Sequence, residues 1–247
     1  MVCYLNYFLC EKYTLCLMYK LPVLEHLPIQ IAHRGNSLLC GDNNMKSFVS
    51  AVENGFDMIE LDILLCKTGE IVVFHDPYIN GVFIDTMTLE EVKEQKIHTL
   101  EEFFDVIKVD EIDIFLDLKG SENVIHPLMT MIKNKFTFKQ MEKIYVSSFN
   151  RKFVQPLAES LLPVNIGLTT ENRFTMEELS LLCKYIKFAC FHWTILDEEA
   201  IKMLHAHNIK VFTYTCKEDI IQRYMMKYDI DGIVTNYPLF AQEPLKD

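Results

Sequence analysis

Long apolar runs, interdomain linkers and positively charged clusters are all missing from this 247-residue sequence. Its 24 lysines and arginines are outnumbered by 35 aspartates and glutamates, which gives a formal net charge of −11. An acidic chain without a basic cluster is a poor candidate for binding nucleic acid, and anionic membranes would repel it. We therefore predict no nucleic-acid partner and no charge-driven membrane contact.

Metal-binding and disulfide patterns of cysteine are also missing. The eight cysteines form no CxxC pair and show no Cys/His spacing of a zinc site. Several lie in apolar stretches, where a free cysteine behaves as a small hydrophobic residue. No Asn-X-Ser/Thr glycosylation site occurs. These observations favour reduced thiols and a cytoplasmic location.

The first 28 residues lack the features of a membrane anchor or a secretory signal. Glu11 and Lys12 divide the apolar segment into two pieces, each far shorter than the roughly 20 residues that span a bilayer. The segment has no basic start and no cleavage site of small residues. We interpret residues 1–28 as an N-terminal extension and residues 29–247 as one domain. A membrane contact of the extension is left open but is not predicted.

Short β-branched or aromatic runs recur along the domain and alternate with segments of helical apolar spacing. Strands that alternate with helices of this length indicate a parallel sheet. Eight such runs in a chain of this size favour an α/β fold with a closed (β/α)₈ barrel over an open sheet. The eight predicted strands span residues 29–35, 58–65, 112–119, 143–149, 164–170, 187–193, 210–215 and 231–236.

One apolar run interrupts this alternation. Residues 71–77 follow the second strand after a five-residue link that contains Thr68 and Gly69. Since five residues cannot hold a crossover helix, the run should pair antiparallel with the second strand as a hairpin. The stretch that follows, to about residue 109, has two short helical patterns. We predict a hairpin and helical insertion before the third barrel strand.

Charged residues gather at the carboxyl ends of the first predicted strands, where (β/α)₈ barrels build their sites. The strand period of two places neighbouring charges two residues apart on one face. Three inward carboxylates would repel each other, and a hard divalent cation such as Mg²⁺ or Ca²⁺ resolves that repulsion. Such a site suits a phosphate ester. The histidines can transfer protons, and the arginine and lysine can neutralise the negative charge of the phosphate. The candidate residues are His33, Arg34, Glu60, Asp62, His75, Asp117 and Lys119.

Seven segments between Ile29 and Phe240 form an ordered set of motifs: HRG, GDNNMKSF, MIELDILLCKTGEIVVFHD, FLDLK, VSSF, KVFTYT and DGIVTNYP. In this order and at these separations, the set resembles the glycerophosphodiester phosphodiesterase family. The resemblance implies a metal-dependent TIM barrel that cleaves small glycerophosphodiesters to glycerol 3-phosphate and an alcohol. It also implies roles for the candidate residues: Glu60, Asp62 and Asp117 as metal ligands, His33 and His75 as the acid/base pair, and Arg34 and Lys119 as phosphate contacts.

Three residues depart from the usual pattern of that family. Asp42 stands in place of a glutamate and must reach with a shorter side chain. Asp117 replaces a glutamate at the third metal ligand, but the related spider-toxin phospholipases D have the same aspartate with a lysine two residues later. Phe212 replaces a frequent tryptophan, which could change how the glycerol or the head group packs.

We interpret the chain as a hydrolase of glycerophosphodiesters with Mg²⁺ or Ca²⁺ as its cofactor. One alternative is a lysophospholipase D or phospholipase D-like enzyme on the same barrel, with an acyl-chain groove to which the apolar extension contributes. The other is a catalytically weak barrel that only binds phosphodiesters, suggested by Asp42 and Asp117. Lys119 is as well suited to pairing with Asp117 as to contacting phosphate, and His192 is expected to be a core residue. The sequence indicates neither the head group nor an oligomeric state.

Overall fold

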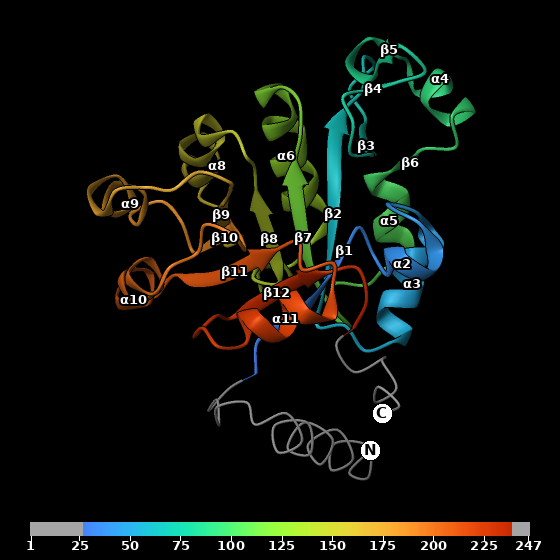
Figure 1. Cartoon of the computed structure of the whole chain (residues 1–247). Coiled ribbons are helices and arrows are strands. Elements are labelled where there is room, and N and C mark those ends of the chain that lie inside the picture. Colours follow the sequence, from blue (N-terminus) through green and yellow to red (C-terminus); the bar gives the residue numbers. More distant parts are fainter. Residues whose placement is uncertain (1–26, 239–247) are drawn as a thin grey trace, which may run out of the picture.

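The computed structural model describes residues 27–238, and its centre is a closed barrel of eight parallel strands (Figure 1). β1 pairs with both β2 and β12, which closes the ring and confirms the predicted (β/α)₈ barrel. The expectations for the N-terminal extension lie almost entirely outside the described residues. The barrel strands are β1 (Ile29–His33), β2 (Met58–Leu65), β7 (Asp113–Leu118), β8 (Ile144–Ser147), β9 (Asn165–Thr170), β10 (Phe188–His192), β11 (Lys210–Tyr214) and β12 (Gly232–Thr235).

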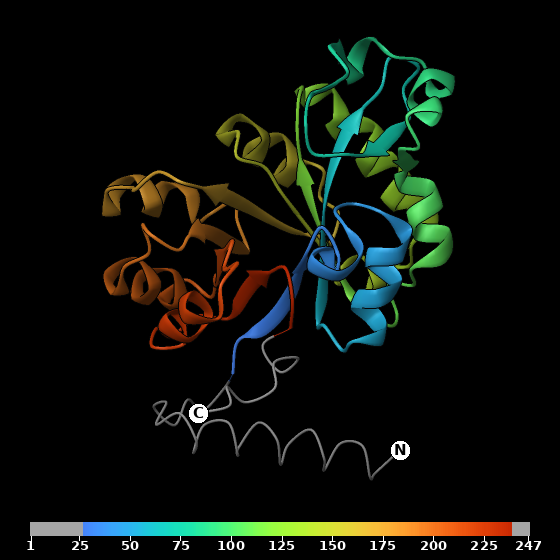
Figure 2. The ribbon, with the colours of Figure 1, turned by 45° about the vertical axis from the view of Figure 1, so that its right-hand side comes forward.

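Helices surround this barrel, as Figure 2 shows from a second direction. They are α2 (Ser37–Cys40), α3 (Met45–Glu53), α6 (Ile125–Lys135), α7 (Phe138–Met141), α8 (Val154–Glu159), α9 (Met176–Leu182), α10 (Glu198–Ala206) and α11 (Asp219–Met225), with 3₁₀ turns η2 (Glu122–Val124) and η3 (Arg151–Phe153). Several begin with a reciprocal capping box, which gives partners to N–H groups that the first helical turn leaves free. Asn44 and Thr175 are such caps. Within residues 27–238, none of the helices combines the length and the apolar character needed to cross a membrane.

The predicted hairpin and insertion after β2 are confirmed. β3 (Ile71–Val73) pairs antiparallel with β2, and Gly69 adopts φ +100° in the connecting turn, a conformation that favours glycine. β4, β5 and α4 form the lobe at the upper right of Figure 1, and the chain then returns to the barrel through β6 and α5. The insertion comprises β4 (Tyr78–Ile79), β5 (Val82–Phe83), η1 (Ile84–Thr86), α4 (Leu89–Glu94), β6 (His98–Thr99) and α5 (Leu100–Val106).

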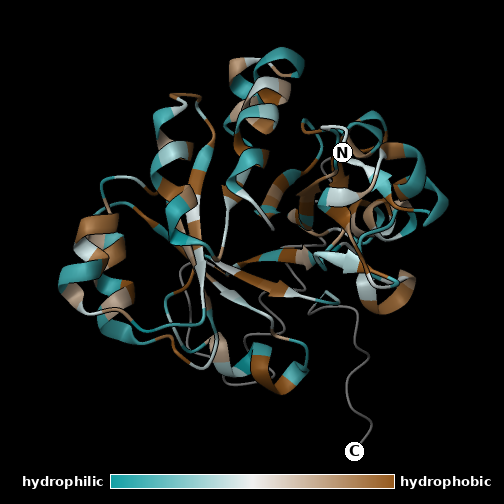
Figure 3. Cartoon of the chain, turned by 90° about the horizontal axis from the view of Figure 1, so that it is seen from above, coloured by the Kyte–Doolittle hydropathy of each residue, from teal (hydrophilic) through white to brown (hydrophobic). Residues whose placement is uncertain are grey.

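Two apolar layers stabilise the barrel. The outer layer lies between helices and strands, and Figure 3 shows hydrophobic and hydrophilic stretches alternating on the surrounding helices. The inner layer fills the barrel with aromatic rings: Phe188 lies 5.1 Å from Phe115 and 5.3 Å from Phe212, measured between ring centroids. Phe212 is fully buried in this inner layer and does not line the cavity described below. Any effect of Phe212 on how the glycerol or the head group packs would therefore act through the residues between it and the cavity, and that effect stays a prediction.

Gly167 on β9 leaves the space that the Phe188 ring of β10 occupies, since a Cβ at Gly167 would lie 2.3 Å from Cε1 of Phe188. An overpacked core loses about 1–3 kcal/mol. Gly167→Ala should therefore lower the free energy of unfolding by about that amount in urea denaturation. Combining it with Phe188→Leu should cost less than the sum of the two single losses. An alanine variant as stable as the wild type, or strictly additive losses, would contradict this competition for space.

Candidate active site

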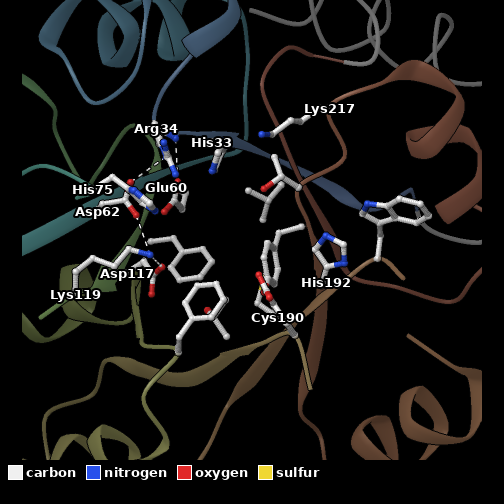
Figure 4. A pocket seen from close by; sticks show the side chains of 18 of the residues that line it. His33, Arg34, Glu60, Asp62, His75, Asp117, Lys119, Cys190, His192 and Lys217 are labelled. Carbon is white, nitrogen blue, oxygen red and sulfur yellow. Dashed lines mark hydrogen bonds and ion pairs between the residues drawn. The ribbon is translucent and has the colours of Figure 1, made fainter. Parts of the chain in front are cut away.

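A cavity of about 410 Å³ opens at the carboxyl ends of the barrel strands, and all seven residues predicted from the sequence line it (Figure 4). Six come from β1, β2, β7 and the residues directly after β1 and β7. His75 comes from the insertion and follows β3 by two residues. The structure thus brings together side chains that lie up to 86 positions apart, between His33 and Lys119. It does so because parallel strands end at the same rim of the barrel.

Three buried carboxylates line one side of this cavity. Asp62 on β2 is the direct neighbour of Asp117 on β7, and Glu60 lies two residues before Asp62 on the same face. One oxygen of each carboxylate lies within 4.8 Å of the others. Asp117 Oδ1 is buried and has no hydrogen-bond partner in the described part of the chain. Clustered oxygens with a free buried acceptor fit a hard divalent cation.

Burial and mutual repulsion raise two of the three carboxyl pKa values. Burial, followed by the charge of Asp62, raises the pKa of Glu60 well above its usual value. Burial raises the pKa of Asp117 to about 6, although Lys119 opposes the shift. Burial would also raise the pKa of Asp62, but Lys119 and Arg34 outweigh it and keep this pKa below its usual value. Asp62 is therefore the fixed negative charge of the cluster.

Two cations contact the carboxylates directly. The Lys119 ammonium lies 2.5 Å from Asp117 Oδ2 and 3.1 Å from Asp62 Oδ1. Arg34 Nε lies 3.0 Å from Asp62 Oδ2, and Arg34 Nη1 lies 2.8 Å from Asp42 Oδ2. The expected pairing of Lys119 with Asp117 is confirmed, and its contact with phosphate stays a prediction. Asp42 does reach Arg34 despite its shorter side chain.

A tight backbone turn sets the position of Arg34. Arg34 and Gly35 adopt φ values of +58° and +79°, which cost energy for an arginine and suit a glycine. A Cβ on Gly35 would lie 2.5 Å from Ser47 Oγ, so only glycine fits there. The turn is fastened on both sides: Arg34 N donates to Glu60 Oε2 at 2.9 Å, and Ser47 Oγ donates to the Arg34 carbonyl at 3.0 Å. The turn thus requires the glycine of the HRG motif and fixes the backbone of the arginine before it.

Both histidines have a polar partner on Nδ1. His33 Nδ1 lies 2.7 Å from Asn236 Oδ1, and His75 Nδ1 lies 2.7 Å from Asp76 Oδ1. Because both partner atoms are acceptors, Nδ1 of each ring carries a hydrogen, and Nε2 is the atom left for proton transfer. Burial, helped by the Arg34 charge, lowers the pKa of His33 to about 4, so this ring is neutral at pH 7.

Several residues that line the cavity or contact a lining residue were not predicted from the sequence. Asn43 Nδ2 donates to Asp62 Oδ2 at 2.8 Å and adds a third contact to that carboxylate, while Asn236 orients His33. His192 lines the cavity, with Nδ1 2.7 Å from Thr194 Oγ1, so its expected place in the core is wrong. Asn236 and His192 lie at or close to the end of a predicted strand, which is the signal that could have indicated them, whereas Asn43 lies eight residues after the first predicted strand and has no such signal. The other lining residues that were not predicted from the sequence are Phe115, Phe149, Thr169, Glu171, Cys190, Tyr214, Thr215, Lys217, Glu218, Ile221 and Val234.

Comparisons with known proteins agree with this geometry. The family model described as "Glycerophosphoryl diester phosphodiesterase family" matches residues 33–239. A glycerophosphodiester phosphodiesterase of Caldanaerobacter subterraneus subsp. tengcongensis is 28% identical, over 84% of this chain and 93% of its own length.

Solved structures share the architecture as well. A phosphodiesterase of Oleispira antarctica, solved in complex with the product sn-glycerol-3-phosphate, has a TM-score of 0.75 and 25% identity, and the match covers 86% of this chain and 94% of that one. A glycerophosphodiester phosphodiesterase of Thermotoga maritima has the same fold, with a TM-score of 0.73 and 24% identity over 86% of this chain and 96% of that one. Since the family model matches most of the sequence and includes every candidate residue, the chain belongs to the glycerophosphoryl diester phosphodiesterase family.

Proposed function

We propose that this protein is a metal-dependent phosphodiesterase that hydrolyses glycerophosphodiesters to glycerol 3-phosphate and an alcohol. The observation that carries the proposal is the buried Glu60, Asp62 and Asp117 cluster with two histidines on the same cavity. The family membership and the product-bound Oleispira relative support the substrate class.

Glu60, Asp62 and Asp117 are the residues that would hold the metal. Their carboxylate oxygens fit either Mg²⁺ or Ca²⁺, and the free Asp117 Oδ1 supplies an acceptor that no protein group uses. A bound divalent ion would stabilise negative charge that develops on the phosphate oxygens. Arg34 and Lys119 would contact the same phosphate from the edge of the cluster, where both already lie beside Asp62.

His33 is the base in this proposal. Its neutral ring, buried and held through Nδ1 by Asn236, has Nε2 ready to take a proton. The proton comes from the attacking hydroxyl as its oxygen bonds to phosphorus. Attack by water gives glycerol 3-phosphate directly, whereas attack by the substrate's own glycerol hydroxyl gives a cyclic phosphate, which a water molecule must then open to glycerol 3-phosphate in a second step. The bond between phosphorus and the alcohol oxygen breaks, and His75 Nε2 gives a proton to that oxygen.

A turnover assay separates this function from its alternatives. The protein is stripped with EDTA and offered glycerophosphocholine or lysophosphatidylcholine, with and without Mg²⁺ or Ca²⁺. Metal-dependent release of glycerol 3-phosphate from glycerophosphocholine supports the proposal. Faster turnover of lysophosphatidylcholine would make the chain a lysophospholipase D. Binding without turnover of either would make it a phosphodiester-binding barrel.

Metal binding should depend on pH, because the ion competes with protons on Asp117 and Glu60. The raised pKa values of these two groups contribute stability to the metal-free protein at low pH. For Asp117 that contribution is lost as the pH rises through about 6, and the shift of Glu60 has the same sign. Saturating Mg²⁺ or Ca²⁺ should therefore raise the Tm more at pH 8 than at pH 5. Differential scanning fluorimetry measures both shifts.

The matched variants for this metal test are Asp117→Asn and Asp105→Asn. The first removes a proposed ligand and should abolish the metal-induced rise in Tm. The second removes an exposed carboxylate that pairs with Lys135 at 2.9 Å, and it should leave the rise unchanged. A rise that survives in Asp117→Asn would contradict the assignment of this ligand.

The activities of the two histidine variants should depend differently on how readily the leaving group departs. His33→Ala and His75→Ala should each lower the turnover of glycerophosphocholine by a factor of about 10²–10⁴, whereas His207→Ala, which does not line the cavity, should not. The p-nitrophenyl ester of glycerol 3-phosphate has a leaving group that scarcely needs an acid. It should restore activity to His75→Ala and leave His33→Ala inactive. If this substrate restored activity to His33→Ala instead, His33 would be the acid and His75 the base.

A further inference from the structure

One lysine of the cavity has no carboxylate partner. Lys217 lines the cavity, and Figure 4 shows its side chain pointing toward His33. Within residues 27–238, the structure gives its ammonium no hydrogen bond and no ion pair, although Glu171 and Glu218 line the same cavity. Arg34 and Lys119, by contrast, each contact two carboxylates.

The backbone that carries Lys217 is fixed to the barrel. Lys217 follows β11 by three residues, directly after the fully buried Cys216. Cys216 N donates to the Val234 carbonyl at 2.9 Å, and its own carbonyl accepts from Thr235 Oγ1 at 2.9 Å. Both partners belong to β12, so the loop that presents the lysine is held at a defined place on the rim.

The distribution of charge around the cavity indicates that Lys217 can attract an anion. The positive charges of Arg34 and Lys119 are offset by carboxylates within 3.1 Å, so much of their attraction for a further anion is already used. Apart from the carboxylate cluster, the Asp and Glu residues that line the cavity are Glu171 and Glu218, which repel anions. Lys217 is thus a lining cation that can attract a phosphate.

We propose that Lys217 is a further phosphate-contacting residue, which binds the substrate's phosphate from the side of the cavity opposite the carboxylate cluster. This inference rests on the proposed phosphodiesterase function and extends it by one residue that neither the motifs nor the family match assigned. The ligand chemistry is a phosphate oxygen, shared by the substrate phosphodiester and the product phosphate monoester. Lys217 therefore acts on affinity, and the proton transfers belong to His33 and His75.

Two measurements on the full chain test Lys217, with glycerol 3-phosphate and glycerophosphocholine as probes. Lys217→Met keeps an unbranched side chain that is one atom shorter and removes the charge, and Lys217→Arg keeps a positive charge at this position. Lys227→Ala is the matched control, because Lys227 is exposed, lies ten residues further on and does not line the cavity. Isothermal titration calorimetry gives the Kd of glycerol 3-phosphate, and steady-state kinetics give KM and kcat.

Lys217→Met should weaken binding of glycerol 3-phosphate about tenfold, or about 1.4 kcal/mol, and raise KM by a similar factor while kcat changes little. Lys217→Arg should recover most of the affinity, and Lys227→Ala should match the wild type. Added KCl should weaken wild-type binding more steeply than binding by Lys217→Met.

An unchanged Kd for glycerol 3-phosphate in Lys217→Met would overturn the inference, even if the wild type hydrolyses glycerophosphocholine. A weakened Kd in a wild-type background without turnover would support the phosphate contact and reject the proposed function. Wild-type protein that binds no glycerol 3-phosphate, with or without metal, would overturn both.

Discussion

Three carboxylates buried within 4.8 Å of one another are the constraint around which the mouth of this barrel is built. Bringing like charges together out of water is costly unless opposite charges or hydrogen bonds compensate. Asp62 has the most compensation, from Arg34, Lys119 and Asn43, and it keeps a low pKa. Glu60 and Asp117 have less, and their raised pKa values show a site that gains from a divalent ion.

This constraint accounts for the motifs beside the cluster. The left-handed turn at Arg34 and Gly35 places one guanidinium against Asp62 and one backbone N–H against Glu60. Lys119 directly follows β7 and lies two residues after Asp117, so its ammonium contacts both Asp117 of β7 and Asp62 of the neighbouring strand β2. The barrel supplies the register that makes these contacts possible, because Asp62 and Asp117 are paired residues of adjacent strands. The strained turn is kept in place by Ser47, which packs against Gly35 and donates a hydrogen bond to the Arg34 carbonyl.

Much of this arrangement could be predicted from the sequence, for physical reasons. Buried strands read as short apolar runs, and charges within such runs are seldom solvated, which identified Glu60, Asp62 and Asp117. Asn43, Asn236 and Lys217 were missed because an amide or a lysine in a loop has no pattern of its own. Their roles come from contacts across the barrel rim, up to 203 positions apart for His33 and Asn236. His192 was misplaced for a related reason: whether a residue near a strand end lies in the barrel interior or in the cavity depends on the stagger of its neighbours.

The most direct measurement of the central claim is a crystal structure of the protein grown with Mn²⁺ and glycerol 3-phosphate, with anomalous scattering recorded at the manganese edge. The account predicts one anomalous peak coordinated by oxygens of Glu60, Asp62 and Asp117, with a phosphate oxygen of the ligand beside it and Arg34 and Lys119 in contact with that phosphate. An empty carboxylate cluster at saturating Mn²⁺, or a manganese ion held by other residues, would contradict it.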